Sequence, residues 1–469
     1  MSQDDAVVVG PSDVPENDSS ENQIIVDSDL DKISYLPIEV LGHILSFLVT
    51  KEAIRTSVLS KRWIDNWTFI DNIVLDDTLL YSVNRSNTVY RHFGNLVNRV
   101  LRRTNSSIRS CSLNLSAHNT HHLNSWIPAI LEKRVQNLCI RAASYIVLSP
   151  CFLFDCNSLV ELMLDIDCTV KVPASNCLPK LQILRLYRIT FDCSSSSAEV
   201  RGLVLCLPVL KVFDSRQCIW HYVTIEAPLL ESFHLEFYNY WPLPYYVTHN
   251  CSLVIVKVCS SRVAKFFYRG HLMEGFIIFD PPLVHNASAD LLLETCREED
   301  VQHAANHARA LLAQIQEVEC LKLAFRQHLV YAKDFLANAP VFRRLTSLQL
   351  DKVTVEALFD LLNKSPNLNT LVLNDATTAI DQDLFASQMA PPCLLFSLKV
   401  VLIREFEPVH LHLAKFVIEK AGVLEHMAIS TVMLWRRLVP AMQNIKDELF
   451  SFSKYSTNAL IEFSINTND

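Results

Sequence analysis

One spacing of apolar residues recurs along most of the chain and limits the folds that the chain can adopt. An apolar residue is followed by a second three positions later and by a third five positions later, as in Leu181, Leu184 and Leu186. Because side chains alternate along a strand, the last two of these residues share one face, which we expect to be buried. Twelve copies of the pattern begin at Ile108, Val135, Leu159, Leu181, Leu210, Leu230, Leu253, Val318, Leu345, Leu368, Leu395 and Leu424.

Outside one long gap, neighbouring copies begin 20 to 29 residues apart. This spacing is typical of leucine-rich repeats. Several intervals between the copies carry apolar faces at helical spacing, including residues 355–362 and 410–421. We therefore expect an α/β fold, a leucine-rich-repeat solenoid or horseshoe, in which neighbouring repeats bury each other's core.

The long gap lies between Leu253 and Val318. Within it, short apolar stretches near Val263 and Leu283 indicate further strands in poor register. The stretch from LLLETC to VQHAANHARALLAQI indicates a helix or a helix pair over residues 289–315.

Residues 31–67 form a separate apolar cluster near the start of the chain. Pro37 can open a helix, because its fixed φ suits the first helical position. Thr50 and Ser60 are candidate N-caps for a second helix and for a third, short helix. Three such helices cannot bury all their apolar side chains among themselves, so the surplus must meet another surface, either in this chain or in a partner.

The segments LPIEVLGHILSFL and TKEAIRTSVLSKRW resemble the F-box in its plant form. The resemblance implies docking on the Skp-type adaptor of SCF ubiquitin ligases, and through it on a cullin-RING ligase. Ile38 stands where the family usually has an acidic residue, and Val49 where it often has proline. The positions that would form or support the docking surface are Leu36, Pro37, Leu41, Ile44, Leu45, Leu48, Val58, Leu59 and Trp63.

Near the C-terminal end, CLLFSLKVVLIREFEP and HLAKFVIEKAGVLEHMAI resemble the FBD domain that closes many plant F-box/leucine-rich-repeat proteins. Glu407 and Pro408 stand where that pattern commonly has a glycine. The segment NSWIPAILEKRVQNLCI at 124–140 is similar to the first repeats of those proteins. Together these features imply a disordered acidic tail at 1–30, an F-box at 31–67, a connector strand and helix at 68–107, the solenoid at 108–390, an FBD domain at 391–463 and a tail at 464–469.

Charge and composition narrow the partners and the compartment. The net charge is −8, and residues 1–30 carry eight acidic and no basic residues, so the remainder is formally neutral. No broad basic field is left to bind nucleic acid or an anionic membrane surface. The start of the chain lacks the pattern of a signal peptide, no apolar run is long enough to span a membrane, and the 14 cysteines include no CxxC pair. We expect reduced thiols and a nuclear or cytoplasmic protein.

The sequence contains few signs of catalytic chemistry. Its seven glycines leave no glycine-rich phosphate loop or nucleophile elbow. His303 and His307 have the i, i+4 spacing of a zinc site, with Cys296 one or two turns earlier, but no fourth ligand is near. An exposed helix face is the favoured interpretation of these histidines. We expect no cofactor, no metal and no enzyme active site.

A binding surface remains, formed by the residues between and after the apolar strand positions. Its mixed charges suit a protein target better than a nucleic-acid backbone. The predicted target-binding residues are Arg185, Tyr187, Arg216, His234, Lys257 and Lys322. With the resemblance, this surface indicates a non-catalytic substrate-recognition subunit of an SCF-type ubiquitin ligase. The alternatives are a receptor that binds its target with the help of a small molecule, and a leucine-rich-repeat scaffold that binds no ligase.

Overall fold

A computed structural model provides the structure of the chain. It describes residues 33–466 except for 34–35, 79–86, 105–106, 149–150, 155, 171–176, 192–202, 221, 238–253, 272–274, 283–286, 295–300, 326–335, 337, 375–388, 408–409, 433–446, 450 and 452–458. The predicted tail at 1–30 and residues 467–469 of the predicted tail at 464–469 lie outside these residues, as does Cys296. Residues 464–466 do not form a tail as predicted, because they end the strand Leu460–Asn466.

A single parallel sheet of fifteen strands runs through the molecule. Its strands, in sheet order, are β1 (Asn72–Asp76), β2 (Ser110–Leu115), β3 (Asn137–Leu148), β4 (Glu161–Val170), β5 (Ile183–Phe191), β7 (Val212–Arg216), β9 (Ser232–Glu236), β11 (Lys265–His271), β13 (Ser288–Glu294), β14 (Cys320–Phe325), β15 (Ser347–Asp351), β16 (Thr370–Asn374), β17 (Val400–Arg404), β18 (His426–Val432) and β19 (Leu460–Asn466). A second parallel sheet has four strands, β12 (Gly275–Phe279), β10 (Val254–Cys259), β8 (Tyr222–Glu226) and β6 (Leu203–Cys206).

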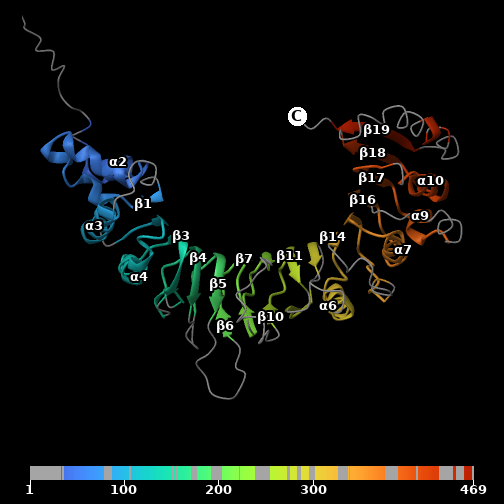
Figure 1. Cartoon of the computed structure of the whole chain (residues 1–469), viewed down its shortest axis with the longest axis horizontal. Helices are drawn as coiled ribbons and strands as arrows, with labels where there is room; N and C mark the ends of the chain where they lie inside the picture. Colours follow the sequence, from blue (N-terminus) through green and yellow to red (C-terminus); the bar gives the residue numbers. More distant parts are fainter. Residues whose placement is uncertain are drawn as a thin grey trace, which may run out of the picture.

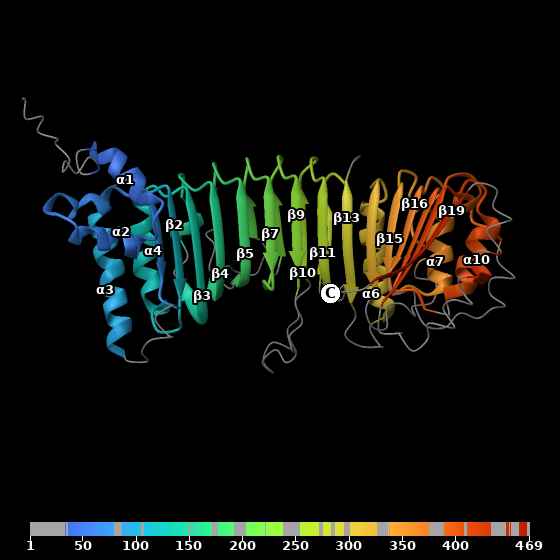
Figure 2. The same ribbon diagram turned by 90° about the horizontal axis from the view of Figure 1, so that it is seen from above.

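The large sheet bends into an arc, and its strands line the concave side (Figure 1). The four-stranded sheet and most helices lie on the convex side, as Figures 1 and 2 show together. These helices are α3 (Asn87–Arg103), α4 (Leu123–Leu131), α6 (Val301–Gln314), α7 (Val355–Asn363), α9 (Pro392–Phe396) and α10 (Leu411–Lys420). The core fills the space between the two layers, where the strand leucines of each repeat, such as Leu184 and Leu371, are fully buried.

Most strands of the large sheet follow the predicted pattern. The copy beginning at Leu395 does not, because the inward residues of β17 are Val401 and Ile403 and Leu395 is exposed. The copy that ends in a polar residue does follow the pattern. Ser215 occupies the last inward position of β7 and is buried. Its hydroxyl accepts a hydrogen bond from the indole N–H of Trp220 at 3.0 Å. Trp220 in turn stacks on Phe191, with ring centroids 4.0 Å apart. The polar atom in the repeat core is therefore satisfied, as burial requires.

In several repeats a residue with left-handed backbone conformation stands two positions after the second inward strand residue, directly after the strand or, in β5, within it. These residues and their φ angles are Arg188 (63°), Gln217 (56°), Lys352 (54°) and Glu405 (52°). Left-handed φ angles usually favour glycine, asparagine or aspartate, and none of these stands at the four positions. The recurrence shows that the repeat geometry imposes this turn whatever the residue.

The interval between Leu253 and Val318 differs from the prediction. The copy beginning at Leu253 supplies β10, which belongs to the four-stranded sheet, so Lys257 lies on the convex layer. The large sheet continues instead through β11, which includes the predicted poor-register stretch near Val263, and through β13. The other predicted poor-register stretch centres on Leu283, which lies outside the described residues. The predicted helix from residue 289 was wrong over its first part, because residues 288–294 form β13 and α6 begins at Val301. The two layers share one apolar alternation, so the pattern cannot tell them apart.

The N-terminal cluster contains two helices, α1 (Ile38–Ser46) and α2 (Thr50–Arg55). Short 3₁₀ turns, η1 (Thr56–Val58), η2 (Lys61–Trp63) and η3 (Asn66–Phe69), stand where a third helix was predicted. Thr50 is not an N-cap as predicted. Its buried hydroxyl accepts the backbone N–H of Val74 at 2.8 Å, because that group on the edge strand β1 needs an acceptor.

Further contacts hold this cluster against the first repeat. Arg103 of α3 pairs with Asp65 at 2.5 Å, and its guanidinium lies 5.7 Å from the ring centroid of buried Trp67. Gly42 of α1 packs so closely on η3 that an added Cβ would lie 2.9 Å from the Cβ of Phe69. The N-terminal helices therefore pack against the first edge of the sheet in one defined orientation.

Because the inward strand positions are buried, we expect a substitution there to lower stability much more than a substitution at an outward position. Leu371→Asp would place an unpaired charge at a fully buried site, and we expect it to lower the melting temperature strongly or to prevent folding. Lys322→Ala removes a half-exposed charge and should change stability by less than about 1 kcal/mol. Thermal unfolding of both variants checks this, and equal losses would contradict the observed register.

The left-handed strand ends predict a second effect, at Gln217. Its side chain is exposed and its backbone N–H donates to the carbonyl of Glu236 at 2.7 Å, a bond that any residue except proline can keep. Gln217→Val should lower the free energy of unfolding by about 1 to 2 kcal/mol, because a β-branched residue resists positive φ. Gln217→Gly should stay within about 1 kcal/mol of the wild type. Urea unfolding measures both, and a more stable valine variant would refute the assignment.

Candidate functional site

An exposed apolar surface surrounds α1 and α2, the helices that lie at the N-terminal end of the arc in Figure 2. Half of the large apolar side chains that are exposed among the described residues lie between residues 33 and 69, which is a small part of the chain. These side chains are Ile33, Ile38, Val40, Ile44, Phe47, Leu48, Val49, Val58, Leu59, Ile64 and Phe69. Such a concentration marks a contact surface, because monomeric proteins seldom expose contiguous apolar area.

The predicted docking residues divide into two groups in the structure. Pro37, Ile44, Leu48, Val58 and Leu59 are exposed, Leu36 is half-buried, and Leu41, Leu45 and Trp63 are buried against the rest of the chain. The buried three can only support the surface from beneath. Val58 and Leu59 are widely exposed, at 86% and 66%.

Sequence reasoning missed several members of this apolar surface. It did not assign Ile33, Phe47 or Ile64 to the docking surface, yet all three are exposed. The helical periodicity selects apolar residues on a single face of a helix. Because α1 carries apolar residues on more than one face, those outside the selected face were overlooked. The signal that could have found the others is the near absence of charged side chains from 33 to 49, where Glu39 is the one acidic residue and no lysine or arginine occurs.

The concave face of the sheet carries charged side chains that pair between or along its strands. The ion pairs are Arg185–Glu161, Arg188–Asp165 at 2.7 Å, Arg216–Asp214 at 2.9 Å, Arg269–Glu236 at 3.2 Å and Lys322–Asp290 at 3.3 Å. Each pair joins a cation to a carboxylate from the same or a neighbouring strand. Most of the charge on the middle of this face is therefore cancelled within the molecule.

Two aromatic groups are built into this polar layer. Tyr187 donates its hydroxyl hydrogen to Asp214 at 2.9 Å, and burial together with that carboxylate raises the pKa of Tyr187 to about 12. His234 stacks on Phe267 with ring centroids 4.0 Å apart. Burial lowers the pKa of His234, and its Nε2 atom is buried without a hydrogen-bond partner. The tyrosine is therefore protonated, and His234 is mostly neutral, at neutral pH.

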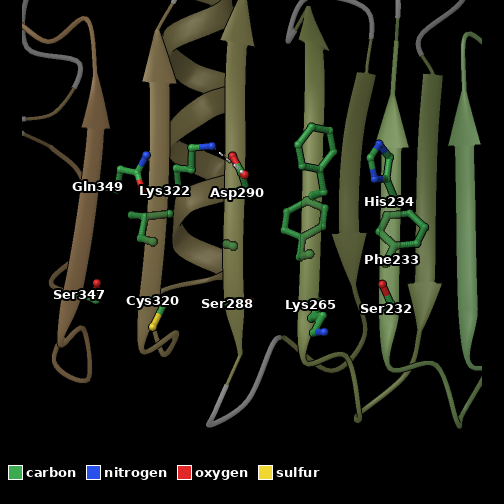
Figure 3. A pocket seen from close by; sticks show the side chains of 14 residues that line it. Ser232, Phe233, His234, Lys265, Ser288, Asp290, Cys320, Lys322, Ser347 and Gln349 are labelled. Carbon is green, nitrogen blue, oxygen red and sulfur yellow. Dashed lines mark ion pairs between the residues drawn. The ribbon is translucent and has the colours of Figure 1, made fainter. Parts of the chain in front are cut away.

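A hollow of about 340 Å³ opens on the concave face over β9, β11, β13, β14 and β15 (Figure 3). Its lining is Ser232, Phe233, His234, Lys265, Phe266, Phe267, Ser288, Ala289, Asp290, Cys320, Leu321, Lys322, Ser347 and Gln349. Small side chains predominate at the first strand position, with Ser232, Ser288 and Ser347 among them. Larger polar and aromatic side chains stand at the next outward position, as Figure 3 shows for His234, Lys322 and Gln349.

The structure brings together part of the predicted target surface. Arg185, Tyr187, Arg216, His234 and Lys322 all lie on strands of the large sheet, and His234 and Lys322 line the hollow. Lys257 does not belong to this surface, because β10 is in the convex layer, where the lysine pairs with Asp280 at 2.8 Å. That carboxylate raises the pKa of Lys257.

The lining residues that the sequence analysis missed include Lys265, Phe267 and Asp290. They occupy β11 and β13, whose pattern was judged to be out of register or helical. The pattern Val263, Phe266 and Tyr268 was the available signal for β11, since all three residues are buried.

Metal-ligand groups and long apolar helices were sought among the described residues only. No group of three or more His, Cys, Asp or Glu side chains in it is arranged to hold a metal ion. His307 lies on α6, as expected from its helical spacing. None of the described helices is both long and apolar enough to cross a membrane.

Comparisons with known proteins agree with the two resemblances. The family model of the F-box domain matches residues 33–68, and that of the FBD matches residues 388–429. An F-box/FBD/LRR-repeat protein of Arabidopsis thaliana is 29% identical over 92% of this chain and 94% of its own length. An F-box/LRR-repeat protein of the same plant is 27% identical over 73% of this chain and 76% of its own length. An FBD-associated F-box protein is 26% identical over 86% of this chain and 100% of its own length.

These matches confirm the family resemblance read from LPIEVLGHILSFL and from the FBD segment. The apolar surface described above falls within the residues of the F-box match, apart from Phe69, which follows it directly. The chain thus carries an F-box near its N-terminal end and an FBD toward its C-terminal end, and it is related along most of its length to plant F-box/FBD/LRR-repeat proteins.

Proposed function

We propose that the protein is a non-catalytic substrate-recognition subunit of an SCF-type ubiquitin ligase. The exposed apolar surface within the F-box match carries this proposal, because it needs a partner and the F-box implies a Skp-type adaptor. The adaptor connects the protein to a cullin-RING ligase, whose other subunits supply the chemistry. The concave face of the sheet holds a target protein.

The sheet fits the second role if the arc is a leucine-rich-repeat horseshoe, which we also propose. Parallel strands of successive repeats pair in register along the arc, and convex helices or strands complete each unit. Solenoids of this kind offer extended concave surfaces for protein partners. We assign the solenoid to residues 108–390, the F-box to 31–67 and the FBD domain to 391–463, and we expect the protein in the nucleus or cytoplasm.

The fixed packing of the F-box against the start of the sheet supports a role in orienting the bound target relative to the ligase. Thr50 is bonded to β1 and Arg103 to Asp65, so the docking surface has one orientation relative to the concave face. A fixed orientation holds the bound target at a defined place near the ligase. It also raises the effective concentration of the target there, as joined binding modules do.

The small-molecule alternative has less support. Sites for small molecules usually enclose about 300 to 1,000 Å³ and are lined mainly by apolar groups. The hollow, at about 340 Å³, lies at the small end of this range and has many polar lining residues. The scaffold alternative requires a damaged docking surface, whereas Val58 and Leu59 are exposed and intact.

The exposed docking residues predict a selective loss of adaptor binding. The double variant Val58→Asp/Leu59→Asp should bind a purified Skp-type adaptor at least about 30-fold more weakly, since losing a central apolar contact costs about 2 kcal/mol or more. Its melting temperature should stay close to that of the wild type, because both side chains are exposed. Isothermal titration calorimetry measures the affinity.

The matched control is Phe396→Asp, which changes an apolar residue with 78% exposure on α9, within the FBD match and far from α1 along the arc. It should bind the adaptor as the wild type does. Wild-type affinity in the Val58/Leu59 double variant would refute the docking assignment.

We expect the same double variant, when it is expressed in cells, to lengthen the half-life of the target protein. It keeps the concave face, so it should capture the target without delivering it to the ligase, and it should compete with the intact protein. Substitution is preferable to deletion of residues 31–67, because deletion would uncover the edge of β1 and its buried Ile73. The target is first identified by co-purification under proteasome inhibition, and its decay is then followed under blocked protein synthesis. An unchanged half-life, with target binding confirmed, would favour the scaffold.

A further inference from the structure

The hollow over β9–β15 differs from the rest of the concave face in its charge balance. Elsewhere in this region the carboxylates are paired, as Glu236 is with Arg269 at 3.2 Å and Asp290 with Lys322 at 3.3 Å. Lys265 is exposed, and no carboxylate of the described residues forms an ion pair with it. With His234 neutral, the hollow is left with one uncompensated positive charge.

An aromatic platform lies two residues from this lysine on the same strand. Phe267 follows Lys265 on β11 and faces the same side of the sheet, because side chains alternate along a strand. Its ring stacks on that of His234 from β9, with an interplanar angle of 25°. Both rings are partly open. The pair therefore offers an apolar surface beside the positive charge.

Serine hydroxyls lie at the level of the lysine, and that of Ser288 makes a long hydrogen bond of 3.4 Å to the carbonyl of Ala264, which a stronger acceptor can replace. Ser232 and Ser288 are the direct register partners of Lys265 on the strands to either side. These small side chains leave the lysine ammonium accessible. A carboxylate that reaches Lys265 from the concave side can also accept hydrogen bonds from these hydroxyls, and charge-assisted bonds of this kind are stronger than neutral ones.

From this arrangement we propose that the hollow binds an extended segment of the target protein with an aspartate or glutamate two residues from an aromatic or large aliphatic residue. The carboxylate pairs with Lys265, and the apolar side chain packs on Phe267 and His234. In an extended peptide, alternate side chains lie on one side about 6.6 Å apart, the same spacing that separates Lys265 and Phe267 along β11. This inference rests on the proposed role of the concave face in target recognition.

The charge balance favours a carboxylate over a phosphate. A phosphorylated side chain carries a charge of about −1.5 to −2 at neutral pH, which exceeds the single positive charge at Lys265. Its excess would also lie near Asp290, whose own charge is already balanced by Lys322. An aspartate or glutamate neutralises the hollow without excess.

Selection from a displayed library of random peptides, about twelve residues long, tests the proposal on the intact protein. Against the wild type, the selected peptides should be enriched in an acidic residue two positions from an aromatic or large aliphatic residue. Lys265→Glu should bind these peptides about tenfold more weakly or worse, and selection against it should no longer enrich acidic residues. Phe267→Ala should lose the apolar preference and keep the acidic one.

The matched control is Arg404→Glu, which reverses another exposed cation of the concave face, on β17 outside the hollow. It should select the same peptides as the wild type. Unchanged acidic enrichment with Lys265→Glu would overturn the proposal, as would equal loss with Arg404→Glu. Tighter binding after phosphoserine replaces the acidic residue of a selected peptide would overturn the choice of a carboxylate.

Adaptor binding, measured on the same preparations, separates this inference from the proposed function. Lys265→Glu should bind the Skp-type adaptor like the wild type, because the lysine lies on β11 and the docking surface at the end of the arc. Adaptor binding without acidic enrichment would defeat the inference alone. Failure of the wild type to bind the adaptor would defeat the proposed function instead, whatever the library selects.

Discussion

The structure depends on the continuous ladder of backbone hydrogen bonds between its parallel strands. In-register pairing, for example of Leu348 with Leu371 and Leu321 with Leu348, keeps each inward position beside the next along the arc. A slip by one residue would turn every inward leucine to the concave surface. The ladder therefore fixes both the core and the outward columns of side chains from which any binding surface must be made.

A ladder of this kind leaves unpaired backbone groups at its ends. At the N-terminal end, the F-box helices resolve the problem and gain a second role. The hydroxyl of Thr50 takes up the Val74 N–H, while Leu41 and Leu45 bury the inner face of α1. The outer face keeps Ile44 and its apolar neighbours exposed. One short segment thus covers the sheet edge and presents a surface that requires a partner.

The concave face combines two electrostatic regimes. Along β4 to β9, pairs such as Arg188–Asp165 and Arg216–Asp214 satisfy the charges within the sheet. These partly buried pairs make the surface specific, since a partner must match or displace them. Lys265 forms no such pair with a described residue, so a negative charge on a partner can pair with it without displacing another carboxylate.

The repeat pattern and the two family segments could be recognised in the sequence alone, whereas the parallel pairing of the strands is seen only in the structure. The repeat pattern and the family segments depend on local periodicity and on contiguous motifs, so Leu184 and Leu371 could be placed in the core from spacing alone. Tertiary structure decided which strands share a layer. β10 and β11 carry similar apolar alternation, yet β10 joins the convex sheet and β11 the concave one. Lys257 on β10 is therefore absent from the concave face, and Lys265 on β11 lines the hollow there. Tertiary structure also decided the role of Thr50, whose hydroxyl bonds the backbone of β1 and does not cap a helix. Such choices depend on which distant backbone groups need a partner, and that need arises only when the repeats stack.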